Sequence, residues 1–319
     1  MRPSRASLNV AAAVLGVLWI ALTGCAVAAD REVLAATELR KLDVGTQQRS
    51  YRLHVGRSVD AARAAPLVLV FHGGGGTPEQ IERESRFSEL ADHEGFVVVY
   101  PAGYRRSWND GRDSDAVAAQ RDGVDDVAFV DALIDDVAAR VRIDPRRIYA
   151  TGISNGAMFS HRVATALSQR IAAIATVAGG LPKPLLARFG ARSPVSVLVV
   201  HGTLDPLVPY AGGEVKVLAS ARGEVAGAEA TAQRWAVHDH CSATPRAVAT
   251  ASDDDCTMTR QAYADCAGGT GVVLLTLDGG GHTWPGGSQY LPQRLVGKAC
   301  RHLDGAGLIW EFFRQHPKP

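Results

Sequence analysis

The sequence predicts a three-layer α/β fold with a mostly parallel central sheet. Two continuous apolar runs, at 66–71 and 96–100, are typical of parallel strands that are covered on both faces. Apolar residues then recur at helical spacing from 127 to 141, until Asp144-Pro145 ends the helix. Strands that alternate with helices in this way form a sheet with helices on both faces.

The remaining elements continue this alternation along the chain. Tyr51, Leu53 and Val55 alternate with polar residues, which predicts a strand with one wet face. Further strands are expected at 147–151, 174–178, 195–201 and 272–277, and further helices at 155–167, 226–238 and 305–313. Because ligands of such sheets bind at the carboxyl ends of the strands, candidate functional residues are sought there.

The composition is that of an ordinary globular protein. The chain has 319 residues, of which 46% are hydrophobic and 21% are charged. Lys and Arg number 34 against 33 Asp and Glu, so no excess of positive charge favours nucleic acid as a partner. No internal repeat or low-complexity linker divides the chain, which predicts one domain at 45–316 behind a tether at 25–44 and leaves the oligomeric state open.

The N-terminus has the pattern of an export signal. Arg2 and Arg5 precede an apolar run at 10–21, which is shorter than the ~20 residues that span a bilayer. Leu22-Thr23-Gly24-Cys25 then resembles a bacterial lipobox, so residues 1–24 are expected to be a lipoprotein-type signal peptide. A lipid on Cys25 would be the sole membrane attachment. The alternative is ordinary cleavage near 26–28, with Cys25 removed.

The other four cysteines are confined to the C-terminal quarter of the chain. An exported protein can pair them, and two disulfides are therefore expected among Cys241, Cys256, Cys266 and Cys300. A zinc site is disfavoured because no pair has the short C-x-x-C spacing. Sequence alone allows three connectivities, of which Cys241–Cys266 with Cys256–Cys300 is adopted as the working pairing.

The strongest motif is Gly152-Ile153-Ser154-Asn155-Gly156, which lies between an expected strand and an expected helix. A sharp strand-to-helix turn strains the backbone at its centre, and glycines on either side avoid steric clashes there. This context predicts that Ser154 projects its hydroxyl above the sheet as a nucleophile. The alternative is an incidental turn.

A serine nucleophile needs a base to take its proton, and an acid to orient that base. His282 follows the last strand in a glycine-rich loop and is the expected base, whereas His161, His238 and His240 have the pattern of packed helix or surface residues. Asp205 follows the strand at 195–201 and is the expected acid. Asp278 is the rival but lies too close to His282 in sequence, and Asp253-Asp254-Asp255 is interpreted as a solvated loop.

The run His72-Gly73-Gly74-Gly75-Gly76 follows the strand at 66–71, and backbone without side chains can approach a substrate oxygen closely. The expected oxyanion donors are the backbone N–H groups near Gly74 and of Asn155. A phosphate-binding loop is disfavoured because the Lys-Ser/Thr pair of a P-loop is absent.

Several specific motifs between about 45 and 315 together resemble a known family. They are PLVLVFHGGGG (66–76), YPAG (100–103), SWND (107–110), DDVAFV (125–130), RIYATGISNGAM (147–158), HGTLD (201–205) and GGGHTWPG (279–286). The chain is similar to exported LpqC-like esterases of the polyhydroxybutyrate depolymerase type, related to feruloyl and acetylxylan esterases of carbohydrate esterase family one. The resemblance implies an α/β-hydrolase fold and a serine esterase without a metal or other cofactor, with Ser154, Asp205 and His282 as catalytic residues.

The match to the polymer depolymerases departs at two points. Many of them carry His-Gly-Cys where this chain has His72-Gly73-Gly74, and this chain ends soon after the helix at 308–313. Soluble hydroxyacyl oligomers or feruloyl and acetyl esters are therefore the expected substrates. Trp108 and Trp284 lie on loops at the active face, where they are expected either to stack on a sugar or aryl acid or to pack within the loops.

Two other functions are weighed against the esterase. One is a lipid-anchored binding protein that keeps the fold without the chemistry, and the other is a lipase or peptidase on the same fold. Ser154, Asp205 and His282, in the required order and each at a strand end, argue against the first. With 6% aromatic residues, no aromatic-rich lid segment stands out in the sequence, although an aliphatic lid stays open, and sequence does not reveal the pockets of a peptidase.

Overall fold

The computed structural model describes residues 36–252 and 256–318. The expected signal peptide, Cys25 and Asp253-Asp254-Asp255 lie outside this part of the chain. Within the two described ranges, no helix has both the length and the apolar character needed to cross a membrane.

A ten-stranded sheet forms the centre of the molecule, with the order β1-β2-β4-β3-β5-β6-β7-β12-β11-β10. Its six middle strands are parallel: β4 (Val97–Pro101), β3 (Ala65–Phe71), β5 (Ile143–Ile153), β6 (Ala173–Val177), β7 (Ser196–Gly202) and β12 (Val272–Asp278). The outer strands are antiparallel: β1 (Glu38–Val44), β2 (Gln47–Val55), β11 (Thr257–Tyr263) and β10 (Arg246–Ser252). Every residue of β3, β4, β6 and β7 is buried, which explains their continuous apolar runs.

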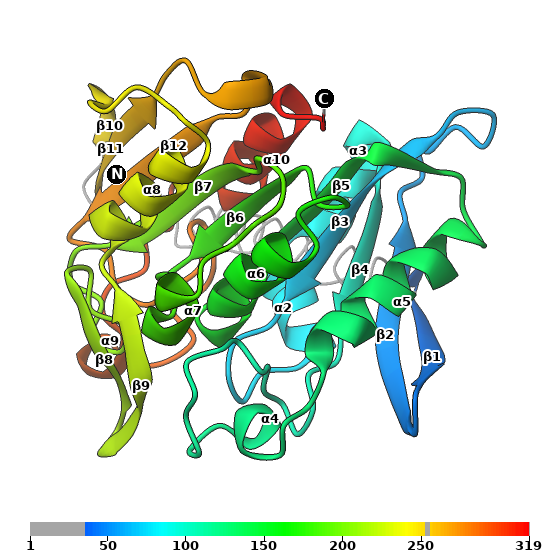
Figure 1. The fold of residues 1–319 in the computed structure, drawn as a ribbon, viewed down its shortest axis with the longest axis horizontal. Coiled ribbons are helices and arrows are strands. Elements are labelled where there is room, and N and C mark those ends of the chain that lie inside the picture. Colours follow the sequence, from blue (N-terminus) through cyan, green and yellow to red (C-terminus); the bar gives the residue numbers. More distant parts are fainter. Residues whose placement is uncertain (1–35, 253–255, 319) are drawn as a thin grey trace, which may run out of the picture.

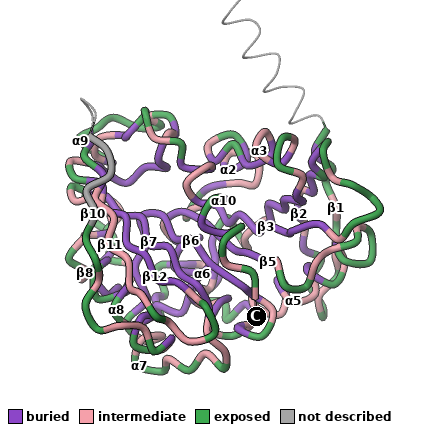
Figure 2. The backbone as a smooth tube through the Cα atoms, turned by 90° about the horizontal axis from the view of Figure 1, so that it is seen from above, coloured by how far each residue is buried: buried purple, intermediate pink, exposed green. Residues whose placement is uncertain are grey.

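Helices cover both faces of this sheet (Figures 1 and 2). One layer contains α5 (Asp126–Ala138), α6 (Asn155–Ala166) and α8 (Ala228–His238), and the other contains α2 (Pro78–Ser85), α3 (Phe87–Glu94) and α10 (Gly305–Gln315). Successive side chains of β3 point to opposite layers: Leu67 and Leu69 belong to one core, and Val68 and Val70 to the other. The predicted three-layer architecture is confirmed, and it is the α/β-hydrolase fold.

The structure corrects the predicted tether at 25–44. Residues 38–44 of that segment form β1, which pairs with β2 across a turn at Gly45, whose φ is +57°. This strand was not predicted because ELRKLDV is mostly polar. Its residues are exposed or half-buried, as is usual for a strand at the edge of a sheet, where charged side chains prevent pairing with another chain. The sheet therefore begins before residue 45.

Several further elements were not predicted from the sequence. They are the helices α2 and α3, the outer strands β10 and β11, the small helices α4 (Ala118–Arg121), α7 (Lys183–Ala187) and α9 (Gln293–Val296), the 3₁₀ turn η1 (Ala267–Gly269), and a hairpin formed by β8 (Gly212–Val217) and β9 (Ser220–Ala226). The hairpin forms a separate two-stranded sheet. Figure 1 shows it with α4 at the end of the sheet where the parallel strands finish.

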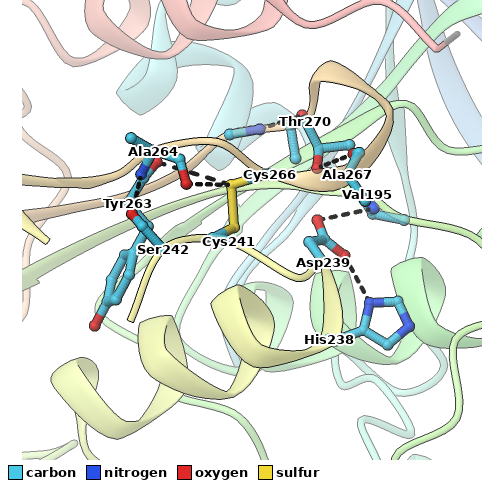
Figure 3. The surroundings of a disulfide bond; sticks show 12 residues. Val195, His238, Asp239, Cys241, Ser242, Tyr263, Ala264, Cys266, Ala267 and Thr270 are labelled. Atoms are coloured by element: carbon cyan, nitrogen blue, oxygen red, sulfur yellow. Dashed lines mark hydrogen bonds and ion pairs between the residues drawn. A yellow bond between two sulfur atoms is a disulfide. The ribbon is translucent and has the colours of Figure 1, made fainter. Parts of the chain in front are cut away.

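Two disulfides join Cys241 to Cys266 and Cys256 to Cys300, which is the working pairing adopted from the sequence. Figure 3 shows the first beside Asp239, whose carboxylate contacts the His238 Nδ1 atom at 2.6 Å and accepts a hydrogen bond from the Val195 amide at 3.2 Å. The end of α8 is thus fixed to the segment that enters β7. His238 therefore has a structural role at the end of α8, where it contacts the carboxylate of Asp239.

Candidate active site

Ser154 occupies a sharp turn between β5 and α6. Its backbone has φ +58° and ψ −122°, a strained conformation for a residue with a side chain. A Cβ atom at Gly152 would lie 2.6 Å from the Phe71 carbonyl oxygen, and one at Gly156 would lie 2.4 Å from the same atom. Only glycine fits at these two positions, which is the reason inferred from the sequence motif.

The Ser154 side chain is available for chemistry. Ser154 occupies the N-cap position of α6, where serine usually accepts a hydrogen bond from the first turn of the helix, but its hydroxyl makes no such bond. Its backbone N–H donates instead to the Val177 carbonyl at 2.9 Å. Ser154 lines a cavity of about 680 Å³ together with the glycine run at 73–76 and His282.

Asp205 is the carboxylate that contacts His282. The distance from Asp205 Oδ2 to His282 Nδ1 is 2.7 Å, and Asp205 Oδ1 accepts hydrogen bonds from the Leu207 and Val208 amides at 2.9 Å each. The rival acid, Asp278, instead accepts a hydrogen bond from Thr203 Oγ1 at 2.9 Å. The carboxylate and the imidazole are both buried, so their relative orientation is fixed.

The Asp205 carboxyl has an altered affinity for protons. Burial by itself would raise its pKa, but interactions with His282 and His201 outweigh burial and hold the pKa well below its ordinary value. His201 Nε2 lies 3.4 Å from Asp205 Oδ2 and 2.9 Å from the Val208 carbonyl oxygen. His201 belongs to the HGTLD motif but was given no role from the sequence, although its position four residues before Asp205 at the end of β7 was a signal.

The loop that carries His282 is held by backbone hydrogen bonds. The His282 amide donates to the Val296 carbonyl at 2.5 Å, and the Gly281 amide donates to the Lys298 carbonyl at 2.8 Å. The Tyr290 hydroxyl donates to the His282 carbonyl at 3.1 Å, and its ring lines the cavity. Nothing in the sequence pattern distinguished Tyr290.

The glycine run is fixed through His72. The imidazole Nδ1 donates to the Gly73 carbonyl at 2.8 Å, while Nε2 accepts from the Gly103 amide at 3.0 Å. Burial lowers the pKa of His72 to about 4, so the ring is neutral and can make both bonds. Gly74 lies next to Asn155: a Cβ atom at Gly74 would be 3.7 Å from the Asn155 Cβ.

The Asn155 side chain links the start of α6 to the loop at 107–112. Its Oδ1 accepts from the Trp108 amide at 2.8 Å, and its Nδ2 donates to the Trp108 carbonyl at 3.0 Å and to Asp110. Asp110 also forms a buried ion pair with Arg112 at 2.8 Å. The sequence did not indicate a role for this buried pair, because neither residue belongs to a periodic pattern.

Of the two roles expected for Trp108 and Trp284, the structure favours packing within the loops over stacking on substrate. Trp108 is 0% exposed and stacks on Phe159 with ring centroids 4.9 Å apart, and its indole N–H donates to the His72 carbonyl at 2.9 Å. Trp284 is 3% exposed and packs edge-on against Phe87. Both indoles fill loop interiors because burial removes their large apolar area from water.

His161 is a packed residue of α6, in line with its expected structural role. It is fully buried, and its Nδ1 accepts a hydrogen bond from the Trp235 indole of α8 at 3.1 Å. Burial lowers the pKa of His161 to about 3. It therefore serves as a neutral acceptor between two helices of the same layer.

Known proteins resemble this chain in sequence and in fold. The family model described as Esterase PHB depolymerase matches residues 49–196. A protein of Nocardia uniformis subsp. tsuyamanensis named "Putative esterase NocK" is 32% identical over 287 residues, which are 87% of this chain and 83% of the relative. Feruloyl esterase B of Piromyces equi is 31% identical over 226 residues, 69% of this chain but only 40% of the relative.

Among solved structures, the acetyl xylan esterase from Aspergillus awamori has the same fold. The two structures superpose with a TM-score of 0.60 at 15% sequence identity, over 87% of this chain and 99% of the other. Fold and relatives together define a carboxylic ester hydrolase. More specifically, the chain belongs to the Esterase PHB depolymerase family.

Proposed function

We propose that Ser154, His282 and Asp205 form a catalytic triad that transfers an acyl group from an ester to water. Asp205 holds the imidazole in the tautomer that leaves Nε2 free to take the Ser154 proton as the hydroxyl attacks the ester carbonyl. The observation that carries the proposal is the 2.7 Å contact between Asp205 and His282 beside the same cavity as Ser154.

The backbone N–H groups of Gly74 and Asn155 are proposed to bind the oxyanion that forms during attack. Their adjacent positions beside Ser154 support this role. His282 then gives its proton to the leaving alcohol, and an acyl-enzyme remains on Ser154. Water repeats the sequence: His282 takes a proton from it, the acyl group leaves as a carboxylic acid, and Ser154 regains its proton.

We propose soluble hydroxyacyl oligomers, or feruloyl and acetyl esters, as the substrate class. A cavity of about 680 Å³ suits a small or oligomeric ester. Part of the cavity wall is apolar and is formed by Leu207, Val215, Val217 and Leu291. Tyr290 lines the cavity near His282. The names of the relatives support feruloyl and acetyl esters, and the family description supports hydroxyacyl esters.

The test is hydrolysis of methyl ferulate and of a soluble 3-hydroxybutyrate oligomer, side by side, with Ser154→Ala as the blank. We expect the variant to lose at least about 10³-fold in kcat because no other group replaces the attacking oxygen. A preference of the wild type for either substrate selects the substrate class. Near wild-type turnover by Ser154→Ala would refute the triad, and a wild type inactive on both would favour the binding-protein alternative.

We also propose that the protein is exported with a lipid anchor on Cys25. The lipobox-like residues 22–25 support the anchor, and the two disulfides support an oxidising compartment. In a bacterial host, Cys25→Ser should move the protein from the membrane to the soluble fraction. An N-terminal peptide that mass spectrometry finds without lipid and beginning beyond Cys25 would refute the anchor.

A further inference from the structure

The cavity beside Ser154 is lined by several cationic side chains. Arg105 and Arg106 reach it from the loop after β4, Arg112 from the next segment, and Arg222 from β9. Glu84 of α2 is the carboxylate among the described lining residues. Neutral esters do not need such an excess of positive charge.

Two of the four guanidinium groups are already neutralised. Arg112 pairs with Asp110 at 2.8 Å, and Arg105 pairs with Asp122 at 3.5 Å. Glu84 accepts a hydrogen bond from Gln80 at 2.9 Å, and among the described residues it forms no ion pair with the arginines of the lining. The cation that acts on the Glu84 carboxyl is Arg83, which lies on the same helix.

The Arg222 guanidinium group has a buried hydrogen-bond donor that lacks an acceptor among the described residues. Its Nε atom is buried and has no hydrogen-bond partner in the described part of the chain, and no described carboxylate lies within ion-pair distance. The backbone beside it is packed: a Cβ atom at Gly223 would lie 3.0 Å from the Arg112 Cβ. A buried donor without an acceptor costs free energy unless a ligand supplies the acceptor.

Arg106 is held toward the same cavity by a strained backbone. Its φ is +61°, its carbonyl accepts from the Gly75 amide at 2.7 Å, and its Nε atom donates to the Gly76 carbonyl at 3.3 Å. In the described ranges no carboxylate forms an ion pair with it. The loop that contains Gly74 thus lies directly beside a guanidinium group that pairs with no described carboxylate.

We propose that Arg222, assisted by Arg106, binds a free carboxylate on the substrate, so that the enzyme prefers anionic esters. Guanidinium groups bind carboxylates through paired charge-assisted hydrogen bonds. Oligomers of hydroxyacids end in such a carboxylate, whereas feruloyl and acetyl esters of neutral sugars carry none. The inference rests on the proposed esterase function and selects one of its two substrate classes.

The test compares the 3-hydroxybutyrate dimer with its terminal carboxamide, which has the same scissile ester but no charge. Wild type should show at least about tenfold higher kcat/KM on the free acid, through a lower KM. Arg222→Gln should reduce the ratio of kcat/KM on the acid to kcat/KM on the carboxamide about tenfold. Arg222→Lys should keep part of this preference, because lysine retains the positive charge but lacks the planar guanidinium group that forms paired hydrogen bonds. Added salt should reduce the wild-type ratio.

Lys216→Gln is the matched control. Lys216 lies in the same hairpin and loses one positive charge in the variant, but its side chain is exposed, pairs with Glu214 at 2.9 Å and does not line the cavity. The ratio of kcat/KM on the free acid to kcat/KM on the carboxamide should be the same in Lys216→Gln as in the wild type. An equal change in both variants would show a general charge effect and would overturn the proposed site.

A binding measurement separates failure of this site from failure of the esterase. Calorimetry with Ser154→Ala should detect the free-acid dimer, and adding Arg222→Gln should weaken binding about tenfold. Hydrolysis by wild type with unchanged ratios in Arg222→Gln would overturn the carboxylate site and leave the esterase intact. Carboxylate binding that depends on Arg222, without any hydrolysis by wild type, would support the site and refute the proposed function.

Discussion

At the scale of single residues, the proton affinity of Asp205 has a consequence for activity. Its pKa is held well below the ordinary value by His282 and His201, against the opposing effect of burial. The carboxylate is therefore expected to stay ionised in mild acid. In the proposed mechanism, a loss of activity in mild acid would therefore have to arise from a group other than Asp205.

We predict that kcat/KM of the wild type falls as the pH is lowered, because a protonated His282 could not take the Ser154 proton in the proposed mechanism. Asp205→Asn should lower kcat by about 10³- to 10⁴-fold because the amide no longer fixes the required tautomer. Steady-state rates on a soluble p-nitrophenyl ester from pH 4.5 to 9 measure both effects.

Asp278→Asn is the control, since Asp278 accepts a hydrogen bond from Thr203 and not from His282. It should keep the wild-type rate and pH profile. A rate that is flat down to about pH 5 would contradict a histidine base.

At the scale of elements, the turn from β5 to α6 depends on close backbone contact with the end of β3. A Cβ atom at Gly156 would lie 2.4 Å from the Phe71 carbonyl oxygen and 2.6 Å from that of His72. Both neighbours are backbone atoms, so no flexible side chain can move to relieve the overlap. The same packing places Ser154 beside the glycine run at 73–76.

We predict that Gly156→Ala destabilises the protein by at least about 2 kcal/mol and lowers kcat, because α6 must shift away from β3. Thermal unfolding followed by circular dichroism, with the esterase assay, measures both. Gly190→Ala is the control, because a Cβ atom there meets only the Arg188 carbonyl oxygen at 3.7 Å. Wild-type stability and activity in Gly156→Ala would show that the turn does not require glycine.

At the scale of the whole molecule, two buried neutral histidines connect distant segments. His72 joins the end of β3 to the loop at Gly103, and His161 joins α6 to α8 through Trp235. Burial lowers the pKa of His72 to about 4 and that of His161 to about 3. In the unfolded chain both imidazoles return to an ordinary value of about 6.5.

This difference predicts acid sensitivity of the folded state. Between about pH 6.5 and 4 the unfolded chain binds protons at both histidines while the folded chain does not, so the free energy of unfolding falls as pH falls. Above about pH 6.5 both states are neutral at these positions, and the stabilisation is fully present. The contribution of His72 alone is on the order of 3 kcal/mol across this window.

Urea denaturation at several values between pH 7 and pH 4.5 checks this prediction. The slope of the free energy of unfolding against pH reports how many more protons the unfolded chain binds than the folded chain. His161→Gln should lower this difference by about one proton, because the variant lacks the imidazole that titrates. His93→Gln removes an exposed histidine of α3 and should leave the slope unchanged. Equal slopes in all three proteins would show that His161 does not govern acid unfolding.

The sequence by itself determined the central strands and the strand–turn–helix motif at Ser154. Runs such as 66–71 are continuous because β3 is covered on both faces, and helical spacing at 127–141 marks one face of α5. The need for glycine at positions 152 and 156 could be predicted from the sequence, because each residue meets a steric requirement of the turn itself. The sequence also paired Asp205 with His282 as residues that follow predicted strands, and the structure adds that these strands, β7 and β12, are parallel neighbours.

Only the tertiary structure decided features that depend on distant neighbours. Edge strand β1 is polar and receives its stability from pairing with β2. Trp108 is buried because Phe159 and the His72 carbonyl surround it. Arg222 differs from the other described arginines that line the cavity because its buried Nε atom lacks an acceptor. Local spacing fixes backbone shape and strand ends, whereas burial, charge pairing and unfilled hydrogen bonds arise from segments that folding brings together.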